Sequence, residues 1–213
     1  FEISTAVGGP FTSTLNINSN GSGNITTTTI YVRMSENTIP GTYTGKVIRF
    51  ENISAGFLFN KGIATSTVNV RNIDVINIEI PDKVYNGNTT AIINDNGTPI
   101  ALDNVRTVDL ALVTLVTTGA TAVFDDPNVA NGINITISGY SISGAASAYY
   151  SLNQPSGYFA NITPKPLTIS GLSTSSRDYD GTTAFTISGT ASLNGVELVD
   201  AGNVSLSGTF TGS

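Results

Sequence analysis

The chain contains no cysteine and no histidine among its 213 residues, and it also has no tryptophan. Without cysteine it forms neither disulfide bonds nor thiolate metal sites. Nucleophilic enzymes that rely on a Ser–His or Cys–His pair are excluded, because the required residues are missing. A glycosidase needs only two carboxylates, but no acidic pair here lies among the aromatic residues that would line a sugar cleft. We therefore expect no enzyme activity and no catalytic residue.

Charged residues are scarce, at 11% against about 25% in an average globular protein. The net charge is −6, and the few lysines and arginines are scattered singly. Nucleic acids and anionic membranes attract clustered basic residues, so we expect neither as a partner. No apolar run approaches the ~20 residues that span a bilayer, so we expect no membrane insertion in this segment. An exported-looking chain without disulfides favours a bacterial cell surface over a eukaryotic extracellular setting.

What the chain does have is the spacing of β-strands. Apolar residues recur at every second position, as in Ile133, Ile135 and Ile137, which alternate with Asn134 and Thr136. This period places one row of side chains on each face of a strand. Gly, Asn, Asp and Pro interrupt the pattern at short intervals, as turn residues do. The sequence predicts an all-β fold built of β-sandwich domains, with no convincing helix.

The most informative feature is a repeat. The stretch Tyr-Asn-Gly-Asn-Thr-Thr-Ala at residues 85–91 returns, 94 residues later, as Tyr-Asp-Gly-Thr-Thr-Ala at residues 179–184. Residues 72–75 correspond to residues 166–169 in the same way. A domain-sized tandem repeat usually builds a modular chain for length or valency. We expect the two motif tyrosines, Tyr85 and Tyr179, to have the same environment.

These patterns divide the chain into three expected domains. Residues 1–71 would be a first β-sandwich that lacks its own first strands. Residues 72–165 would be one full repeat, and residues 166–213 a truncated second repeat. The connector Pro164-Lys165-Pro166 carries two prolines, which restrict the backbone to extended conformations. We expect the domains to be arranged end to end, within a longer protein.

Four segments carry a resemblance to a known family. They are residues 83–87 with their counterpart 178–181, residues 124–129, residues 149–152 and residues 161–167. In order and spacing these segments resemble the YDG-type repeat of very large adhesins on bacterial cell surfaces. The leading residues 1–71 resemble immunoglobulin-like modules in surface proteins of gliding gram-negative bacteria. The resemblance implies an extracellular stalk of a cell-surface adhesin, such as a gliding-motility adhesin, with neighbouring domains as partners and no catalysis.

The motif itself has two interpretations. Tyr85-Asn86-Gly87 and Tyr179-Asp180-Gly181 predict a structural turn, because Asn-Gly and Asp-Gly favour the type I′ turn of hairpins. The tyrosine ring would then pack at the end of the sandwich, with its hydroxyl bonded to the backbone. The alternative is a binding site, with an aromatic platform and a carboxylate for a sugar or calcium. The exchange of Asn86 for Asp180 favours the turn, since the two residues differ in charge.

Calcium is the one cofactor that the composition leaves open. The candidate ligands are the acidic residues near the motifs: Asp125, Asp126, Asp178, Asp180 and Asp200. Calcium takes six to eight oxygen ligands, and no loop here spaces acidic residues as dedicated calcium loops do. The stretch Asp126-Pro127-Asn128 is more simply a turn held by the aspartate side chain. We therefore expect no cofactor and no metal.

Three functions remain. The first is a structural stalk that carries adhesive regions away from a bacterial surface. The second is a module that binds glycans or other surface components through exposed aromatic residues, for which the candidates are Tyr140, Tyr149, Tyr150 and Tyr158. The third is a filament subunit, in which a neighbour's strand completes the truncated copy.

Overall fold

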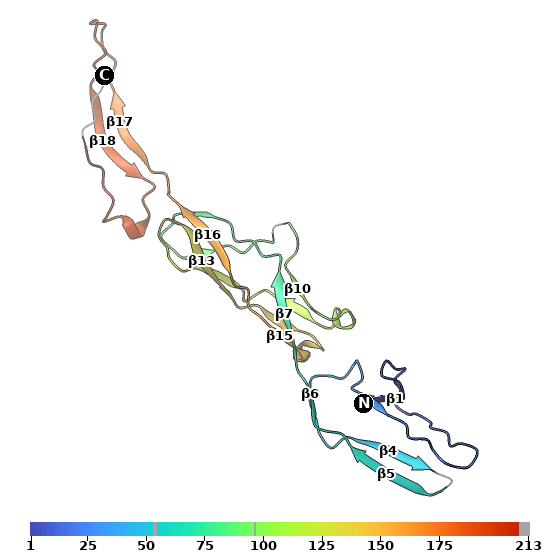
Figure 1. Ribbon diagram of the computed structural model, residues 1–213. Helices are drawn as coiled ribbons and strands as arrows, with labels where there is room; N and C mark the ends of the chain where they lie inside the picture. Colours follow the sequence, from blue (N-terminus) through green and yellow to red (C-terminus); the bar gives the residue numbers. More distant parts are fainter. Residues whose placement is uncertain (53–54, 96, 209–213) are drawn as a thin grey trace. The chain divides into compact units, whose positions relative to one another are not determined.

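The computed structural model describes residues 1–52, 55–95 and 97–208. The fold is all-β, with about 40% of residues in strands, which confirms the predicted class (Figure 1). The remaining regular elements of these residues are three short 3-10 turns: η1 (Thr107–Asp109), η2 (Ser147–Tyr149) and η3 (Leu198–Asp200). In the described ranges, no helix has the length and apolar character needed to cross a membrane.

The chain forms two compact units, Phe1–Arg71 and Asn72–Ser213. The first unit has six strands: β1 (Glu2–Ser4), β2 (Tyr31–Arg33), β3 (Gly41–Tyr43), β4 (Val47–Asn52), β5 (Phe57–Gly62) and β6 (Ser66–Val68). They pair as three antiparallel ladders, β1 with β2, β3 with β6, and β4 with β5. None of the described hydrophobic residues of this unit is fully buried. Its immunoglobulin-like character stays a prediction.

The second unit begins with the full repeat, residues 72–165, which we name the first copy. Its strands are β7 (Arg71–Ile76), β8 (Lys83–Val84), β9 (Thr90–Ala91), β10 (Ala101–Asp103), β11 (Thr114–Val116), β12 (Thr121–Phe124), β13 (Ala130–Ser138), β14 (Ser141–Ser143), β15 (Tyr150–Leu152) and β16 (Tyr158–Thr163). A five-stranded sheet has the order β8-β16-β13-β12-β9, and a three-stranded sheet the order β10-β7-β15. Strands β11 and β14 form a third ladder.

Two clusters of buried side chains hold the first copy together. The larger one packs inner residues of the five-stranded sheet, and Tyr140 beyond the end of β13, against Val75 of β7; the sheet residues are Ala122, Phe124, Ile133, Ile135, Ile137, Ala160 and Ile162. In β13, Ile133, Ile135 and Ile137 are buried and the residues between them are exposed, as the period of two predicts. The smaller cluster contains Ile73, Val113, Ala146 and Tyr150. Burial of such side chains is the main stabilising contribution to a sandwich of this size.

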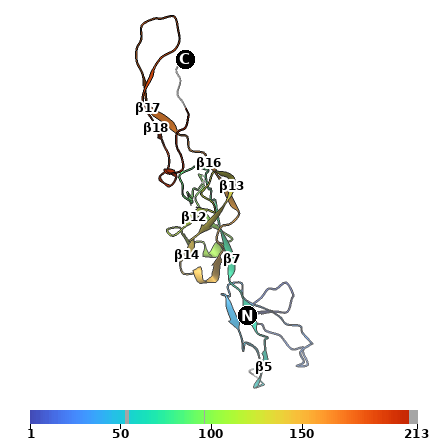
Figure 2. The ribbon, with the colours of Figure 1, turned by 90° about the vertical axis from the view of Figure 1, so that its left-hand side faces the viewer.

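Residues 166–213, which we name the second copy, begin with the hairpin β17 (Thr168–Thr174) and β18 (Ile187–Asn194), whose strands lie side by side in both views (Figures 1 and 2). Residues 209–213 of the expected partial copy lie outside the described residues. In the first copy, Asp74 pairs with Asp103, and the corresponding residues Thr168 and Asn194 pair in the second. The same strand register therefore returns with the sequence.

Two backbone positions confirm this correspondence independently. Asn77 and Asn104 have positive φ angles of 65° and 64°, and their counterparts Gly171 and Gly195 have φ angles of 80° and 94°. Asparagine and glycine tolerate this conformation better than other residues. Asn77 follows the end of β7 and reverses the parity of the strand, so Ile78 and Ile80 pack against the larger cluster after Val75. This is the local irregularity that a shift in apolar parity requires.

Candidate functional site

The Tyr85-Asn86-Gly87 motif lies in residues 85–89, which we name the closing loop of the first copy. This loop joins β8 to β9, which are the two outer strands of the five-stranded sheet. The backbone N–H of Tyr85 donates to the carbonyl of Thr163 at 2.8 Å, and the N–H of Phe124 donates to the carbonyl of Thr89 at 2.7 Å. The sheet curls enough for this short loop to bridge its two edges.

The type I′ hairpin predicted for this motif is wrong. A hairpin joins neighbouring strands, whereas the closing loop joins opposite edges of one sheet. Gly87 has a positive φ angle of 73°, but Asn86 does not, since Asn77 and Asn104 are the described non-glycine residues with positive φ. The Asn86 side chain instead accepts the backbone N–H of Asn88 at 3.3 Å. The turn is thus held by a side chain, which is the other way asparagine stabilises turns.

Lys83 holds the closing loop through hydrogen bonds from its ammonium group. Its Nζ donates to the side chain of Asn86 at 3.0 Å, to the side chain and carbonyl of Asn88, and to the carbonyl of Thr90 at 3.1 Å. The same ammonium group lies 5.0 Å from the centre of the Phe124 ring. Burial lowers the pKa of Lys83. One cation therefore ties the loop to both edges of the sheet.

The second copy repeats this arrangement with different residues. Arg177 stands where Lys83 does, and it donates to the Asp180 carboxylate and to the Thr182 carbonyl. These acceptors correspond to Asn86 and Asn88. The hydrogen bond to Arg177 holds the pKa of Asp180 below its ordinary value. A cation and a turn-forming Asn or Asp therefore build the same loop in both copies, which explains why Asn86 and Asp180 are interchangeable.

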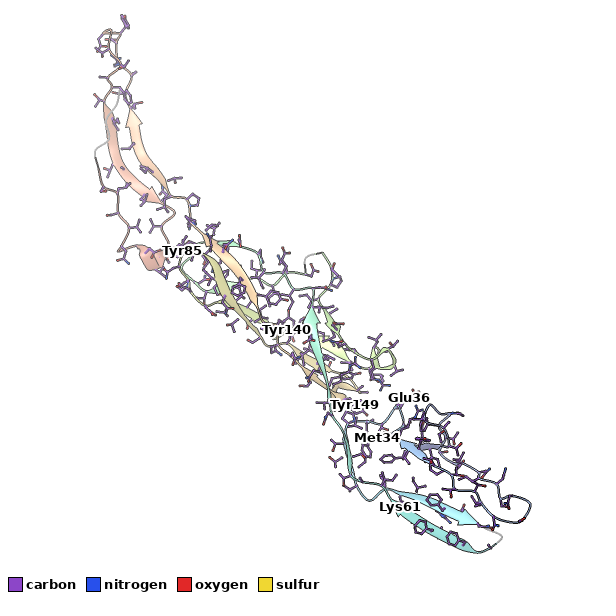
Figure 3. All side chains as sticks on the ribbon, viewed as in Figure 1. Met34, Glu36, Lys61, Tyr85, Tyr140 and Tyr149 are labelled. Atoms are coloured by element: carbon purple, nitrogen blue, oxygen red, sulfur yellow. The ribbon has the colours of Figure 1, made fainter. Side chains whose placement is uncertain are left out.

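The closing loop of the first copy contacts the η3 turn of the second copy. The Tyr85 hydroxyl donates a hydrogen bond to the Asp200 carboxylate, which raises the pKa of Tyr85 because the neutral phenol is the donor. A Cβ built on Gly87 would lie 2.6 Å from Cγ2 of Val199, so any other residue at this position would displace that side chain. Figure 3 shows Tyr85 beside this turn. The motif is thus part of a joint between copies.

A second contact lies at the connector. Strand β16 ends at Thr163 and β17 begins at Thr168, so only a few residues separate the two copies. Within them, the Lys165 ammonium group pairs with the carboxylate of Glu197, which directly precedes η3. The joint therefore combines a short connector, an ion pair and the contact between the closing loop and η3.

The counterpart of Tyr85 in the second copy is in a different environment. Tyr85 is partly buried, whereas Tyr179 is 97% exposed. The expectation that both tyrosines share one environment is therefore wrong. The reason is that Tyr85 packs against the larger cluster of its own copy and contacts Asp200 of the following one, whereas the described residues cover Tyr179 with neither.

The counterpart of η3 in the first copy is η1, which lies at the other end of that copy. Asp109 of η1 accepts a hydrogen bond of 2.6 Å from the hydroxyl of Tyr150, so it is tied to the smaller core cluster. Figure 3 shows Tyr149, the neighbour of Tyr150, at the opposite end of the copy from Tyr85. Around η1, Val108 and Leu110 are 64% and 60% exposed. The first copy thus carries a closing loop at one end and a 3-10 turn at the other.

The four tyrosines proposed as binding candidates do not form one exposed surface. Tyr140 and Tyr158 pack in or against the larger cluster, and Tyr149 and Tyr150 in or against the smaller one. Burial raises the pKa values of Tyr140 and Tyr150. Of the four, Tyr140 borders a hollow of about 650 Å³, but this residue is only 4% exposed.

The acidic residues considered for calcium are separated and bonded to protein donors. Asp125 accepts from Asn134 at 2.7 Å and Thr136 at 3.1 Å, and Asp126 accepts the backbone N–H of Asn128 at 2.8 Å, which confirms the turn predicted there. Asp180 and Asp200 take part in the contacts given above, and Asp178 is exposed. The described residues contain no group of three or more acidic side chains placed to hold a metal ion.

Sequence reasoning missed the residues that contact the motif. A signal for them was present, because Val108-Asp109 returns as Val199-Asp200 in the same order relative to Val113 and Val204. Both Val108 and Val199 are exposed in the structure, at 64% and 63%. Of the two, Val199 lies against the closing loop at Gly87, a contact that a pattern of strand periodicity does not reveal.

Comparison with known proteins agrees with this repeat structure. The family model for the YDG domain matches the chain twice, over residues 69–157 and residues 163–213. No curated protein and no solved structure matches the chain. The two matches begin near the starts of the two copies and together include more than half of the 213 residues. The chain belongs to the YDG domain family.

Proposed function

We propose that this segment is a structural spacer of an extracellular bacterial adhesin, in which tandem copies hold adhesive regions away from the cell surface. The proposal depends on one observation, which is that the two ends of the first copy carry different structures. Its closing loop and its η1 turn lie at opposite ends, and its last strand leads directly into the next copy. Repeats joined in this way extend in one direction, because each contacts only its neighbours.

The surface chemistry also supports a spacer. Charged residues make up 11% of the chain, and hydroxyl and amide side chains dominate the remaining polar residues. Serine pairs cross the second copy's hairpin, where Ser170 and Ser192 lie 3.0 Å apart and Ser173 and Ser188 lie 2.9 Å apart. Such a surface stays solvated without long-range charge attraction, which suits a segment that must not bind its surroundings.

The finer parts of this proposal are the location and the type of adhesin. We propose that the segment lies outside the cell and that the adhesin serves gliding motility. Both proposals depend on the resemblance of the motifs to repeats of large bacterial surface adhesins. The leading unit would then be an immunoglobulin-like module. Brief protease treatment of intact cells that express the full protein tests the location: fragments cut within this segment are expected without cell lysis. Protection until the cells are lysed would overturn the extracellular assignment.

Small-angle scattering on the 213-residue chain tests the spacer itself. We expect a maximum dimension that fits the leading unit, the first copy and the second copy in sequence. A variant with Pro164→Gly and Pro166→Gly is the control for connector stiffness, and its scattering should show a broader distribution of dimensions. A compact particle that binds glycans on an array would instead favour the binding module. The hollow beside Tyr140 would then be its first candidate site.

A further inference from the structure

The closing loop of the first copy contains a chemically reactive pair, Asn86-Gly87. The backbone nitrogen of a residue that follows asparagine can attack the side-chain amide carbon, Cγ, and glycine hinders this attack least because it has no side chain. Asn86 is exposed to water, and among the described residues no acceptor pairs with the N–H of Gly87. The attacking nitrogen and the amide that it attacks are therefore both accessible.

Two donors already hold the oxygen of this amide. Oδ1 of Asn86 accepts from Nζ of Lys83 at 3.0 Å and from the backbone N–H of Asn88 at 3.3 Å. The second of these bonds folds the side chain over the backbone that follows it, toward Gly87. Attack at Cγ places negative charge on Oδ1, and donors that are in position beforehand stabilise such a charge. The arrangement is that of an oxyanion hole, with an ammonium group as one donor.

We propose that Asn86 converts itself to aspartate, with Lys83 and the N–H of Asn88 stabilising the charge that develops on Oδ1. The Gly87 nitrogen forms a bond to Cγ and gives its proton to water, while Nδ2 takes a proton from water and leaves as ammonia. The product of this step is a cyclic imide. Water then adds to Cγ and breaks its bond to the Gly87 nitrogen, which takes back a proton. Water is the only other reactant, and ammonia is the only other product.

The same donors determine how the imide opens. The ring has two carbonyl groups, and attack of water at the backbone carbonyl would give isoaspartate, in which the chain runs through the side chain. Lys83 and the N–H of Asn88 lie at Oδ1, so they activate Cγ and favour ordinary aspartate. Isoaspartate would also lengthen the backbone next to Gly87, where the Val199 side chain lies. We therefore expect aspartate as the main product.

The second copy shows that the product fits the loop. Asp180 stands at the corresponding position, and its carboxylate accepts from Arg177 and from the backbone N–H of Thr182 at 2.9 Å. The glycine that follows has a φ angle of 74°, against 73° in the first copy. An aspartate at position 86 would pair with Lys83 in the same way. The conversion would give both loops a pair of cation and carboxylate.

The pair Asn131-Gly132 provides a matched control within the same copy. Both residues are exposed, and Gly132 also has a positive φ angle, of 64°. Its N–H, however, donates to Oδ1 of Asn161 at 2.8 Å. Attack by this nitrogen would have to break that hydrogen bond first, and among the described residues no ammonium group holds the Asn131 amide oxygen. We expect Asn131 to remain asparagine for much longer.

Mass spectrometry of peptides from the folded chain, sampled during incubation at neutral pH, tests the proposal. Asn86 should lose its amide at least about tenfold faster than Asn131, which is the factor that one hydrogen bond from a charged group provides. In urea-unfolded chain the two rates should converge, and isoaspartate should dominate at both sites. Equal rates in the folded chain, or isoaspartate as the main folded-state product at Asn86, would overturn the proposal.

Two substitutions separate the role of the cation from that of the turn. Lys83→Met removes the charged donor and should slow the conversion of Asn86 about tenfold. Lys83→Arg keeps a cation at this position and should retain more of the rate than Lys83→Met. Asn131 is the internal reference in both variants. Faster conversion in Lys83→Met would show that the lysine protects the amide, which is the opposite of the proposal. The comparison of the two sites in the unmodified chain does not depend on the stability of either variant.

Discussion

Tyr85 and Tyr179 occupy the same position in two homologous copies. The Tyr85 hydroxyl is hydrogen-bonded to Asp200, whereas the Tyr179 side chain is 97% exposed. The loops around them are alike in cation, turn residue and glycine conformation. The difference therefore arises outside the loops: Tyr85 packs against the larger cluster of its own copy and lies beside η3 of the next, and the described residues cover Tyr179 with neither. This motif tyrosine thus contacts both its own domain and the neighbouring copy.

Replacing the two tyrosines by phenylalanine should have unequal effects. Tyr85→Phe removes the hydroxyl that bonds to Asp200, so the two copies should move more independently. Tyr179→Phe keeps a ring that is exposed and should leave this motion unchanged. Relaxation or residual dipolar coupling measurements on both variants check this. Equal behaviour of the two variants would show that the Tyr85 hydroxyl does not restrain the joint.

The two motif glycines provide a matched pair. Gly87→Ala and Gly181→Ala each place a Cβ at a φ angle near 73°, which should cost about 1 kcal/mol in either copy. At Gly87 the new Cβ would lie 2.6 Å from the Val199 side chain. A new Cβ at Gly181 would meet only the Tyr179 hydroxyl, at 4.0 Å. Gly87→Ala should therefore also displace η3, seen as shifts of the Val199 methyl signals. Unchanged Val199 signals would contradict the contact.

Lys83 should tolerate arginine but not an apolar residue. The second copy already has Arg177 at this position, with equivalent acceptors. Lys83→Arg is expected to keep the closing loop, whereas Lys83→Met leaves several acceptors without their donor. Hydrogen bonds to a charged group contribute about 2 kcal/mol, so Lys83→Met should lower the free energy of unfolding by that order. Urea unfolding of both variants measures it, and similar losses for the two would refute the cation's role.

Tyr150 should be the tyrosine whose hydroxyl matters most within the first copy. It is 7% exposed and donates to Asp109 at 2.6 Å. Tyr150→Phe is expected to lower the free energy of unfolding by about 1–2 kcal/mol, since it leaves the acceptor unpaired. Tyr149→Phe, in the same cluster, is the control and should have a smaller effect. Thermal unfolding of the two variants compares them.

Alkaline pH should weaken the fold through its buried phenols. Burial raises the pKa of Tyr140, and burial with the Asp109 hydrogen bond raises that of Tyr150, above the ordinary value of 10.0. In the unfolded chain these groups lose their protons first, so their contribution is complete below pH 10 and is lost as the pH rises through the folded pKa values. Unfolding free energies measured on both sides of pH 10 should show this decline, and Tyr150→Phe should reduce it.

The sequence predicted the elements that depend on local patterns. The alternation in Ile133–Ile137 indicated the correct strand face, and Asp126-Pro127-Asn128 indicated a side-chain turn that the structure confirms. The hairpin at Asn86-Gly87 was wrong because local turn chemistry does not reveal which strands a loop joins. The packing of the Tyr85 ring against the sandwich core was predicted and is confirmed. Its hydroxyl partner was not predicted, because Asp200 is more than a hundred residues away in the sequence.

The placement of the first and last strands of the first copy has a mechanical consequence. The chain enters this copy through β7 and leaves it through β16, which belong to different sheets and run in the same direction (Figure 1). A pull on the two ends of the copy would therefore slide each strand along its neighbours and load its hydrogen bonds together. Asn161 of β16 adds to this resistance, because its backbone N–H and its Nδ2 each donate a hydrogen bond of 2.8 Å to the Asp82 carboxylate. Under tension, such a copy should yield all at once and not by opening one bond after another.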